Sequence, residues 1–122
     1  MTVAFENEEA KHRFLGFLGL AKRAGRVISG TPMVCAALAE REKPSLVLYA
    51  EGASAASKKK VVCKCSFYGV RAEELAISPE ELAHVIGKTG AVAAVAVTDA
   101  GFAEAMIKKL SPDVGTKTLA TN

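Results

Sequence analysis

The chain has 122 residues, of which 50% are hydrophobic and 24% are charged, and its formal net charge is +3. A chain of this length and composition buries enough surface to form a core without a metal or disulfides, which excludes a disordered protein. The longest apolar runs, residues 46–50 and 91–97, are far shorter than the roughly 20 residues of a membrane-spanning helix. The N-terminal segment is acidic, unlike a secretory signal, so we expect a cytoplasmic protein without a membrane partner.

The first predicted elements are a long helix and a short strand. Apolar residues at three- and four-residue spacing predict a helix over residues 8–24 that ends at Gly25. The apolar residues that follow predict a strand over residues 27–29. The helix has one apolar face, so it needs a partner layer to cover that face.

A second helix and a buried strand follow. Thr31 is the predicted cap of this helix, with Pro32 at its first position, where the missing N–H is not needed. We expect the helix to reach about Arg41. The uninterrupted apolar run 46–50 is typical of a strand buried on both faces, which implies helices on both sides of a sheet.

Ser54 is the predicted cap of a third helix that ends at Gly69. The residues expected on its inward face are Val61, Val62, Cys65 and Tyr68. Residues 70–77 are a weaker strand candidate because Glu73 and Glu74 interrupt the apolar pattern.

The last third of the chain predicts two helices around one buried strand. Ser78 begins a helix, and Glu81 three residues later completes the pattern of a capping box. Residues 87–90 form a turn and residues 91–97 a second buried strand. Asp99 opens the last helix, which has one apolar face.

The alternation of strands and helices predicts an α/β fold. We expect a three-layer α-β-α sandwich with a mixed sheet of about four strands, as a single domain over residues 1–122. Residues 111–122 are expected to form a loose C-terminal tail.

Motifs for metal, nucleotide or catalytic chemistry are incomplete. Cys63 and Cys65 are two residues apart, so on a helix their thiols point to nearly opposite sides, and no second pair completes a metal site. Residues 87–89 resemble the end of a phosphate-binding loop, but Leu82 stands where that motif needs glycine. Asp99 is explained as a helix cap. We therefore expect no enzyme, no metal and no cofactor.

Basic residues cluster at two places, which suits a nucleic-acid partner, although a run of lysines usually forms only a solvated surface. Lys22, Arg23 and Arg26 lie at the junction of the first helix and strand, and residues 58–60 are three consecutive lysines. Aromatic residues make up only 6% of the chain, which predicts a poor supply of stacking surfaces for single strands.

Five segments in order resemble one family. They are residues 18–30, 46–54, 64–68, 81–88 and 95–103. Together they are similar to the kink-turn RNA-binding ribosomal proteins, the group named for large-subunit ribosomal protein seven-Ae, and within it to the small bacterial YlxQ-like branch. The resemblance covers residues from about Arg13 to Leu110.

The resemblance implies an α-β-α sandwich that inserts one end between the strands of a sharply bent RNA. The turn into the second helix and the loop before the last strand would make this contact. The implied partners are structured RNA, either a kink-turn or ribosomal RNA, and ribosomal or other translation proteins. The residues then expected at the RNA edge are Gly30, Thr31, Met33 and Lys88, with Lys22, Arg23 and Arg26 as phosphate contacts.

The sequence departs from the family at three positions of the second helix. Family members that bind kink-turns tightly carry Gly-Thr-Asn-Glu and a Lys three residues later, and those polar positions are Pro32, Met33 and Ala36 here. We therefore expect the base-reading side chains to be missing. The alternative is a protein-interaction scaffold on the same fold, in which Met33 and Ala36 present an apolar patch.

Overall fold

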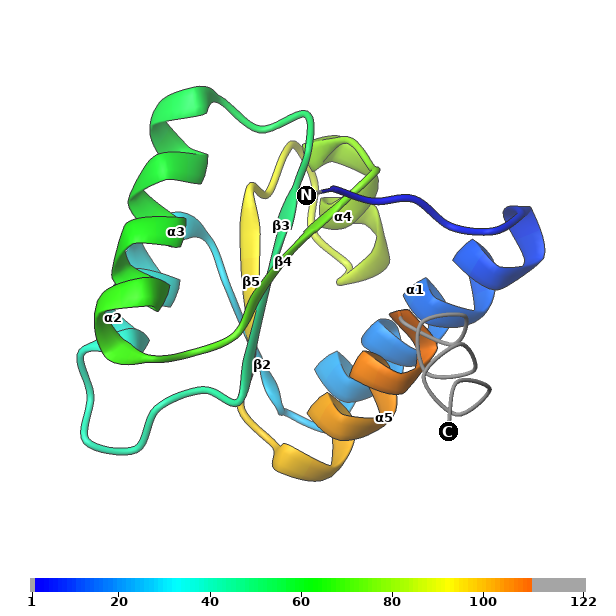
Figure 1. Cartoon of the computed structure of the whole chain (residues 1–122). Helices are drawn as coiled ribbons and strands as arrows, with labels where there is room; N and C mark the ends of the chain where they lie inside the picture. Colours follow the sequence, from blue (N-terminus) through cyan, green and yellow to red (C-terminus); the bar gives the residue numbers. More distant parts are fainter. Residues whose placement is uncertain (1, 111–122) are drawn as a thin grey trace, which may run out of the picture.

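Strands and helices alternate along the residues that the structure, a computed structural model, describes, namely 2–110 (Figure 1). In chain order they are β1 (Thr2–Val3), α1 (Glu8–Arg23), β2 (Val27–Ser29), α2 (Thr31–Leu38), β3 (Leu46–Ala50), α3 (Ala55–Tyr68), β4 (Ala72–Leu75), α4 (Pro79–Val85), β5 (Ala94–Val97) and α5 (Ala100–Leu110). The tail expected over residues 111–122 lies outside the described residues.

The strands form one mixed sheet in the order β1-β4-β3-β5-β2. β1, β4 and β3 are parallel, and β5 is antiparallel to both β3 and β2. The sequence predicted about four strands, and the fifth is β1, whose two residues are too few to show a pattern. The C-terminal ends of β2, β3 and β4 therefore meet the N-terminal end of β5 at one end of the strands. We call this end of the sheet the Gly30 edge.

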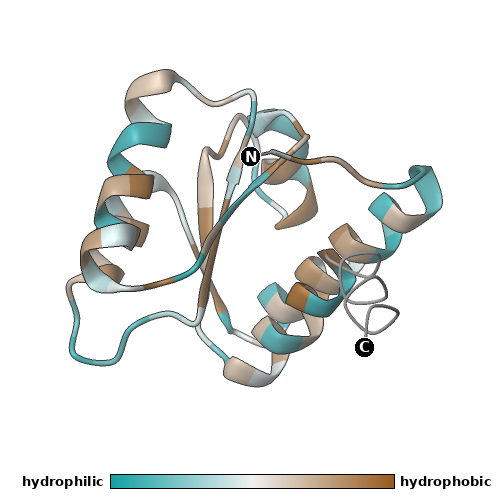
Figure 2. Ribbon diagram, in the orientation of Figure 1, coloured by the Kyte–Doolittle hydropathy of each residue, from teal (hydrophilic) through white to brown (hydrophobic). Residues whose placement is uncertain are grey.

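Helices cover both faces of this sheet, which confirms the predicted three-layer sandwich. α2 and α3 lie on one face, and α1, α4 and α5 lie on the other (Figure 1). Alternate residues of β3 serve the two layers: Leu48 packs toward α1, and Val47 toward α2 and α3. Figure 2 shows hydrophobic residues along the central strands and hydrophilic residues in the loop between α2 and β3.

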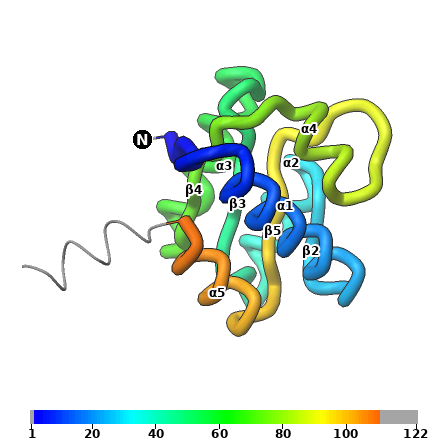
Figure 3. Tube along the Cα trace, turned by 90° about the vertical axis from the view of Figure 1, so that its right-hand side faces the viewer, coloured from blue at the N-terminus to red at the C-terminus, as the bar shows by residue number. Residues whose placement is uncertain are grey.

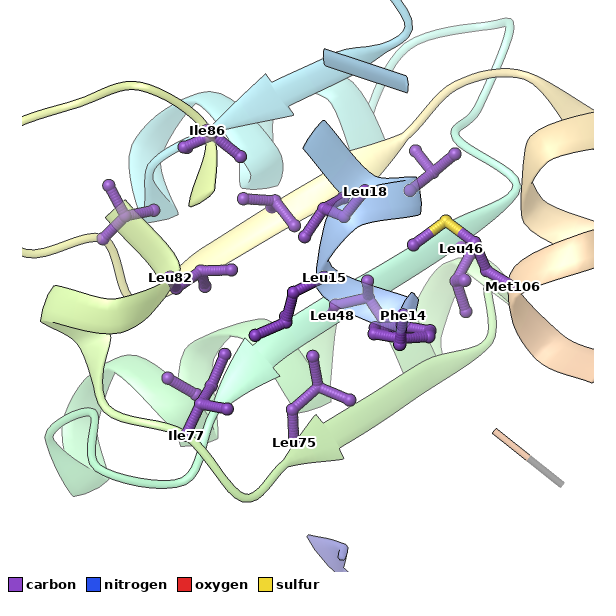
Figure 4. Packing of buried hydrophobic residues seen from close by; sticks show 14 of the residues in the cluster. Phe14, Leu15, Leu18, Leu46, Leu48, Leu75, Ile77, Leu82, Ile86 and Met106 are labelled. Atoms are coloured by element: carbon purple, nitrogen blue, oxygen red, sulfur yellow. The ribbon is translucent and has the colours of Figure 1, made fainter. Parts of the chain in front are cut away.

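The larger core lies between the sheet and the layer of α1, α4 and α5. Phe14 and Leu18 of α1 are at most 1% exposed and pack with Leu48, while Met106 of α5 closes the same cluster (Figure 4). Burial of a side chain of this size stabilises the fold by about 1.5–3 kcal/mol. This core fixes the positions of α1 and α4 beside the sheet edge described above.

Side-chain caps start four of the helices, as the sequence predicted for three of them. Ser54 accepts from the Ser57 N–H at 3.1 Å, and Ser78 accepts from the Glu81 N–H at 3.0 Å. The further cap pairs are Asn7 with Ala10 in α1, and Asp99 with Phe102 at α5. The Glu81 carboxylate, predicted to close a capping box, lies 2.9 Å from the Lys11 ammonium.

The predicted end of α2 and the predicted inward face of α3 are wrong. α2 ends at Leu38 rather than near Arg41, because the next residues are exposed and offer no apolar side chain to bury. Val62 is 39% exposed and does not share the inward face of α3, where Val61 and Cys65 are buried. The buried pair is four residues apart, and Val62 lies about 100° around the helix from Val61.

Candidate nucleic-acid interface

The turn from β2 into α2 and the loop before β5 lie side by side at one edge of the sheet. The Gly30 N–H donates to the Ala94 carbonyl over 2.9 Å, which ties the turn to the first residue of β5. The loop that ends at β5 contains the exposed residues 87–91. Of the residues that the sequence placed at this edge, Gly30, Thr31 and Met33 lie in the turn and the start of α2. Lys88 lies in the loop before β5.

Gly30 is the residue that gives this edge its shape. Its φ of 96° and ψ of 138° belong to a region that is almost restricted to glycine. No atom lies within 4 Å of where a Cβ would stand, so the space beside its backbone is open to a partner.

The predicted side-chain cap of α2 by Thr31 is wrong. The N-cap is Gly30, Thr31 is the first helical residue, and no side chain accepts a hydrogen bond at this N-terminus. Gly30 takes the cap position because its positive φ turns the chain one residue earlier. The first amides of α2, including those of Thr31 and Met33, point out of the helix with the positive end of its dipole.

The three residues that depart from the family's polar pattern all face outward on α2. Met33 is 60% exposed, and Pro32 and Ala36 are exposed as well, whereas Val34 and Leu38 are buried against the sheet. The outer side of the helix start is therefore apolar, and any polar contact made there uses the backbone amides.

The loop before β5 presents one cation on an exposed, glycine-bracketed turn. Gly87 and Gly90 have φ values of 76° and 82°. The Lys88 N–H donates to the Ala83 carbonyl at 2.9 Å, and the Val92 N–H donates to the Pro79 carbonyl at 3.0 Å. Both ends of the loop are thus fixed to α4, and the exposed Lys88 side chain extends from a defined position.

The basic cluster of Lys22, Arg23 and Arg26 lies at the opposite end of β2 from Gly30 (Figure 1). The three residues of β2 separate Arg26 from Gly30, so their Cα atoms are four steps of about 3.3 Å, or roughly 13 Å, apart. Arg23 also lines a groove between α1 and α4. Figure 3 shows the α1–β2 turn and the loop before β5 on the same side of the molecule.

The three consecutive lysines of α3 do not act as one group. The Lys58 ammonium lies 2.9 Å from Glu74 Oε2 and donates to the Glu51 carbonyl at 3.1 Å. The Glu74 pKa is lowered by the hydrogen bond from Thr2 and by Lys58, and the Lys58 pKa is raised by its bond to Glu74. Lys58 is therefore occupied within the protein, and Lys59 and Lys60 are exposed.

The cysteines do not form a reactive or metal-binding group in the part of the chain that the structure describes. Burial raises the pKa of the Cys65 thiol to about 11, so it stays protonated at neutral pH. Cys63 is exposed, on the other side of α3. Within residues 2–110, no cluster of three or more metal-ligating side chains occurs.

The sequence and the fold place this chain among known proteins. Residues 13–107 match the ribosomal protein L7Ae/L30e/S12e/Gadd45 family. The chain belongs to this family. None of its described helices is both long and apolar enough to cross a membrane.

Two curated proteins are similar over most of the chain. An "RNA-binding protein YlxQ" of Bacillus subtilis is 42% identical over 93 residues, which is 76% of this chain and 90% of the relative. The protein of the same name from Enterococcus faecium is 38% identical over 98 residues, which is 80% of this chain and 91% of the relative.

Solved structures share the fold. A protein of unknown function from Bacillus halodurans aligns with a TM-score of 0.72 and 29% identity, covering 80% of this chain and 95% of that one. The 15.5kD RNA binding protein of Giardia lamblia aligns with a TM-score of 0.69 and 17% identity, covering 88% of this chain and 92% of that one. The second similarity concerns the fold alone.

Proposed function

We propose that this chain is a non-enzymatic RNA-binding protein that binds sharply bent, kink-turn-like RNA. The observation that carries the proposal is the edge at which the uncapped start of α2 lies beside the loop before β5, held by the bond from Gly30 to Ala94. Relatives up to 42% identical are named RNA-binding proteins, which supports it. The ribosomal proteins of the family support a place in cytoplasmic translation.

Each part of the edge has a chemical role in this proposal. Gly30 carries no side chain, so RNA approaches its backbone closely. The amides of Thr31 and Met33 donate to phosphate or base-edge acceptors at the positive end of α2. Lys88 binds the RNA backbone from the neighbouring loop. Lys22, Arg23 and Arg26 are the phosphate contacts for the flanking helical strand.

The departures at Pro32, Met33 and Ala36 remove side chains that would read bases. A base-specific pair of hydrogen bonds is worth about 1–3 kcal/mol of discrimination. Recognition in this chain therefore relies on RNA shape and backbone contacts, and it is weaker than in family members with the polar residues.

A second candidate function is a protein-interaction scaffold. The observation that favours it is the 60% exposure of Met33, beside exposed Pro32 and Ala36. Exposed apolar patches often mark protein contacts. The RNA titration described next separates the RNA-binding function from the scaffold function.

The test is a titration of the full chain with a kink-turn RNA and with the same duplex lacking the bulge. We expect tighter binding to the kink-turn. The triple variant Pro32→Asn, Met33→Glu, Ala36→Lys should gain at least about tenfold in affinity for the kink-turn, since about 1.4 kcal/mol is the low end for a base-specific pair.

The three substituted side chains are exposed, so the thermal midpoint of the triple variant serves as the control and should stay close to that of the wild type. Equal affinity for the two RNAs, together with no gain in the triple variant, contradicts the kink-turn function. That result would favour the protein-interaction scaffold over the kink-turn function.

A further inference from the structure

The outer face of α3 carries an exposed aromatic side chain among lysines. Phe67 is 80% exposed, more than the other large hydrophobic residues that are exposed in the described chain. It lines a shallow hollow of about 390 Å³ with Lys60, Cys63, Lys64 and Tyr68. We call these five residues the α3 patch. The low aromatic content predicted a poor stacking surface, but the fold places two of the seven Phe and Tyr residues together here.

Helical spacing explains why the patch faces outward. Lys60, Lys64 and Phe67 lie four and then three residues apart, which puts them on one side of α3. Val61 and Cys65, which are buried against the sheet, lie on a different side of the helix. The patch is therefore a continuous strip, and its large apolar ring makes no contribution to the core.

The protein holds the aromatic pair in place without a partner. The rings of Phe67 and Tyr68 meet edge to face, with centroids 4.9 Å apart and an interplanar angle of 88°. The Lys43 ammonium lies 4.5 Å from the centre of the Tyr68 ring and donates to the Glu40 carbonyl at 2.7 Å. Tyr68 of α3 thus contacts both Lys43 of the loop before β3 and the ring of Phe67.

The charges of the patch favour a polyanion. The ion pairs found among residues 2–110 involve Lys11, Lys58 and Arg71, so the ammonium groups of Lys60 and Lys64 are free to bind a ligand. Protein interfaces are depleted in lysine, whereas lysines beside an exposed aromatic ring are typical of surfaces that bind single-stranded nucleic acid.

The patch is separate from the edge at Gly30. α3 starts at that edge of the sheet and has 14 residues, with Phe67 next to last. The start of α3 and Phe67 are about 18 Å apart, at about 1.5 Å per residue. Figure 1 shows that α3 runs away from this edge toward the loop between α2 and β3.

We propose that the α3 patch binds an unpaired stretch of RNA, with one base stacked on Phe67 and the adjoining phosphates on Lys60 and Lys64. The proposal rests on the proposed RNA-binding function and extends it to a second, single-stranded contact. RNA that folds into a bend at the Gly30 edge would then be held more tightly when it carries a single-stranded extension.

The experiment compares three probes on the full chain: an oligouridylate, a kink-turn RNA, and the same kink-turn with an oligouridylate tail. Phe67→Ala should weaken binding of the oligouridylate by about fivefold or more, the effect of losing one stacked base. Phe67→Leu should lose as much, because it keeps apolar bulk without a π-face, and Phe67→Tyr should retain binding. Phe67→Ala should leave the tailless kink-turn unaffected and remove the advantage of the tail.

Leu20→Ala is the matched control, because Leu20 is an exposed apolar residue, at 49%, on α1. It should change none of these affinities. Lys60→Ala and Lys64→Ala should each lower the salt dependence of oligouridylate binding by about one phosphate contact.

The failures of the two proposals are distinguishable. Oligouridylate binding that is absent or unaffected by Phe67→Ala, with intact kink-turn binding, overturns the α3 patch alone. Oligouridylate binding that depends on Phe67, without kink-turn binding, overturns the kink-turn function alone. An acidic peptide that binds as tightly as the oligouridylate, with Phe67→Leu retaining the binding of both, shows a protein-docking surface and also overturns this proposal.

Discussion

A single glycine decides how α2 begins. Thr31 and Pro32 follow a pattern typical of a capped helix, yet the helix starts from Gly30 at φ 96° and is left without a side-chain cap. The result is a set of free amides beside an open space. At the other helices a side chain satisfies the corresponding donor, as Ser78 does for Glu81. A glycine N-cap costs the helix only about a few tenths of a kcal/mol relative to a side-chain cap, and it leaves donors available to a ligand.

Two glycine substitutions should have opposite effects on stability. Gly30→Ala should lower the free energy of unfolding by about 1–3 kcal/mol, because alanine is strained at this φ and ψ. Gly16→Ala should raise it by about 0.5–1 kcal/mol, because Gly16 lies inside α1 with open space around it. Urea unfolding of both variants measures the difference.

Gly30→Ala should also weaken RNA binding, since its methyl group enters the space that the proposed contact uses. An unfolding free energy of Gly30→Ala equal to that of the wild type would show that the backbone relaxes there. A stable Gly30→Ala variant with full RNA affinity would remove Gly30 from the interface.

At the scale of residues, the sequence predicted which side chains cap helices better than it predicted which side chains face the core. The cap by Ser54 followed from a local pattern and is confirmed. Val62 was misplaced because polar and apolar residues alternate around α3 without a clear apolar face. Contact with the sheet, which the sequence does not show, decides which residues are buried. The exposed Phe67 was missed for the same reason, although its spacing from Lys60 and Lys64 was visible in the sequence.

At the scale of elements, most helices and strands could be predicted because each has its own sequence signal: a capping residue at its start, a glycine at its end, or a continuous apolar run. β3 and β5 are apolar throughout, and they are neighbours inside the five-stranded sheet. β1 could not be predicted, because its two residues form a strand only by pairing with β4, where Thr2 lies opposite Glu74. The bond between Gly30 and Ala94 is likewise long-range, so only the resemblance predicted that the turn into α2 and the loop before β5 are neighbours.

Glu74 joins three elements, and this contact should depend on pH. Thr2 of β1 donates to its Oε1 at 2.6 Å, and Lys58 of α3 lies 2.9 Å from its Oε2. The folded state lowers the Glu74 pKa below its usual 4.5, so folding favours the deprotonated form. The resulting stabilisation is complete above about pH 5 and is lost as pH falls through the folded pKa.

Glu74→Gln should therefore lower the thermal midpoint by about 2–5 °C near pH 7. As the pH falls through the folded pKa of Glu74, the gap between the thermal midpoints of variant and wild type should narrow. Glu104→Gln, on the exposed side of α5, is the control and should show no such pH-dependent gap. A gap that stays constant from neutral to acidic pH would mean that the charge of Glu74 does not contribute.

At the scale of the whole molecule, the cations of the candidate interface lie at two ends of one side. Lys88 lies in the loop before β5, and Arg23 and Arg26 lie at the α1–β2 turn (Figure 3). The net charge is only +3, so attraction for RNA depends on where these residues are placed rather than on their number.

RNA affinity should fall steeply with salt if these cations contact phosphates. Alanine at Lys22, Arg23, Arg26 or Lys88 should lower the slope of log affinity against log salt by roughly one contact each. Lys108→Ala, an exposed lysine in the last turn of α5, is the matched control and should leave the slope unchanged. Binding that does not respond to salt would contradict the assignment of all four residues.

The outer strands of the sheet have a consequence for self-association. An edge strand offers unpaired backbone groups to a foreign strand, and here the edges are β1 and β2, with two and three residues. A second chain thus finds too few partners for a stable β-bridge. If β1 detaches, the new edge is β4, which carries Glu73 and Glu74. Charged side chains on an edge strand disfavour pairing with a second copy, so loss of β1 does not expose an unprotected apolar edge.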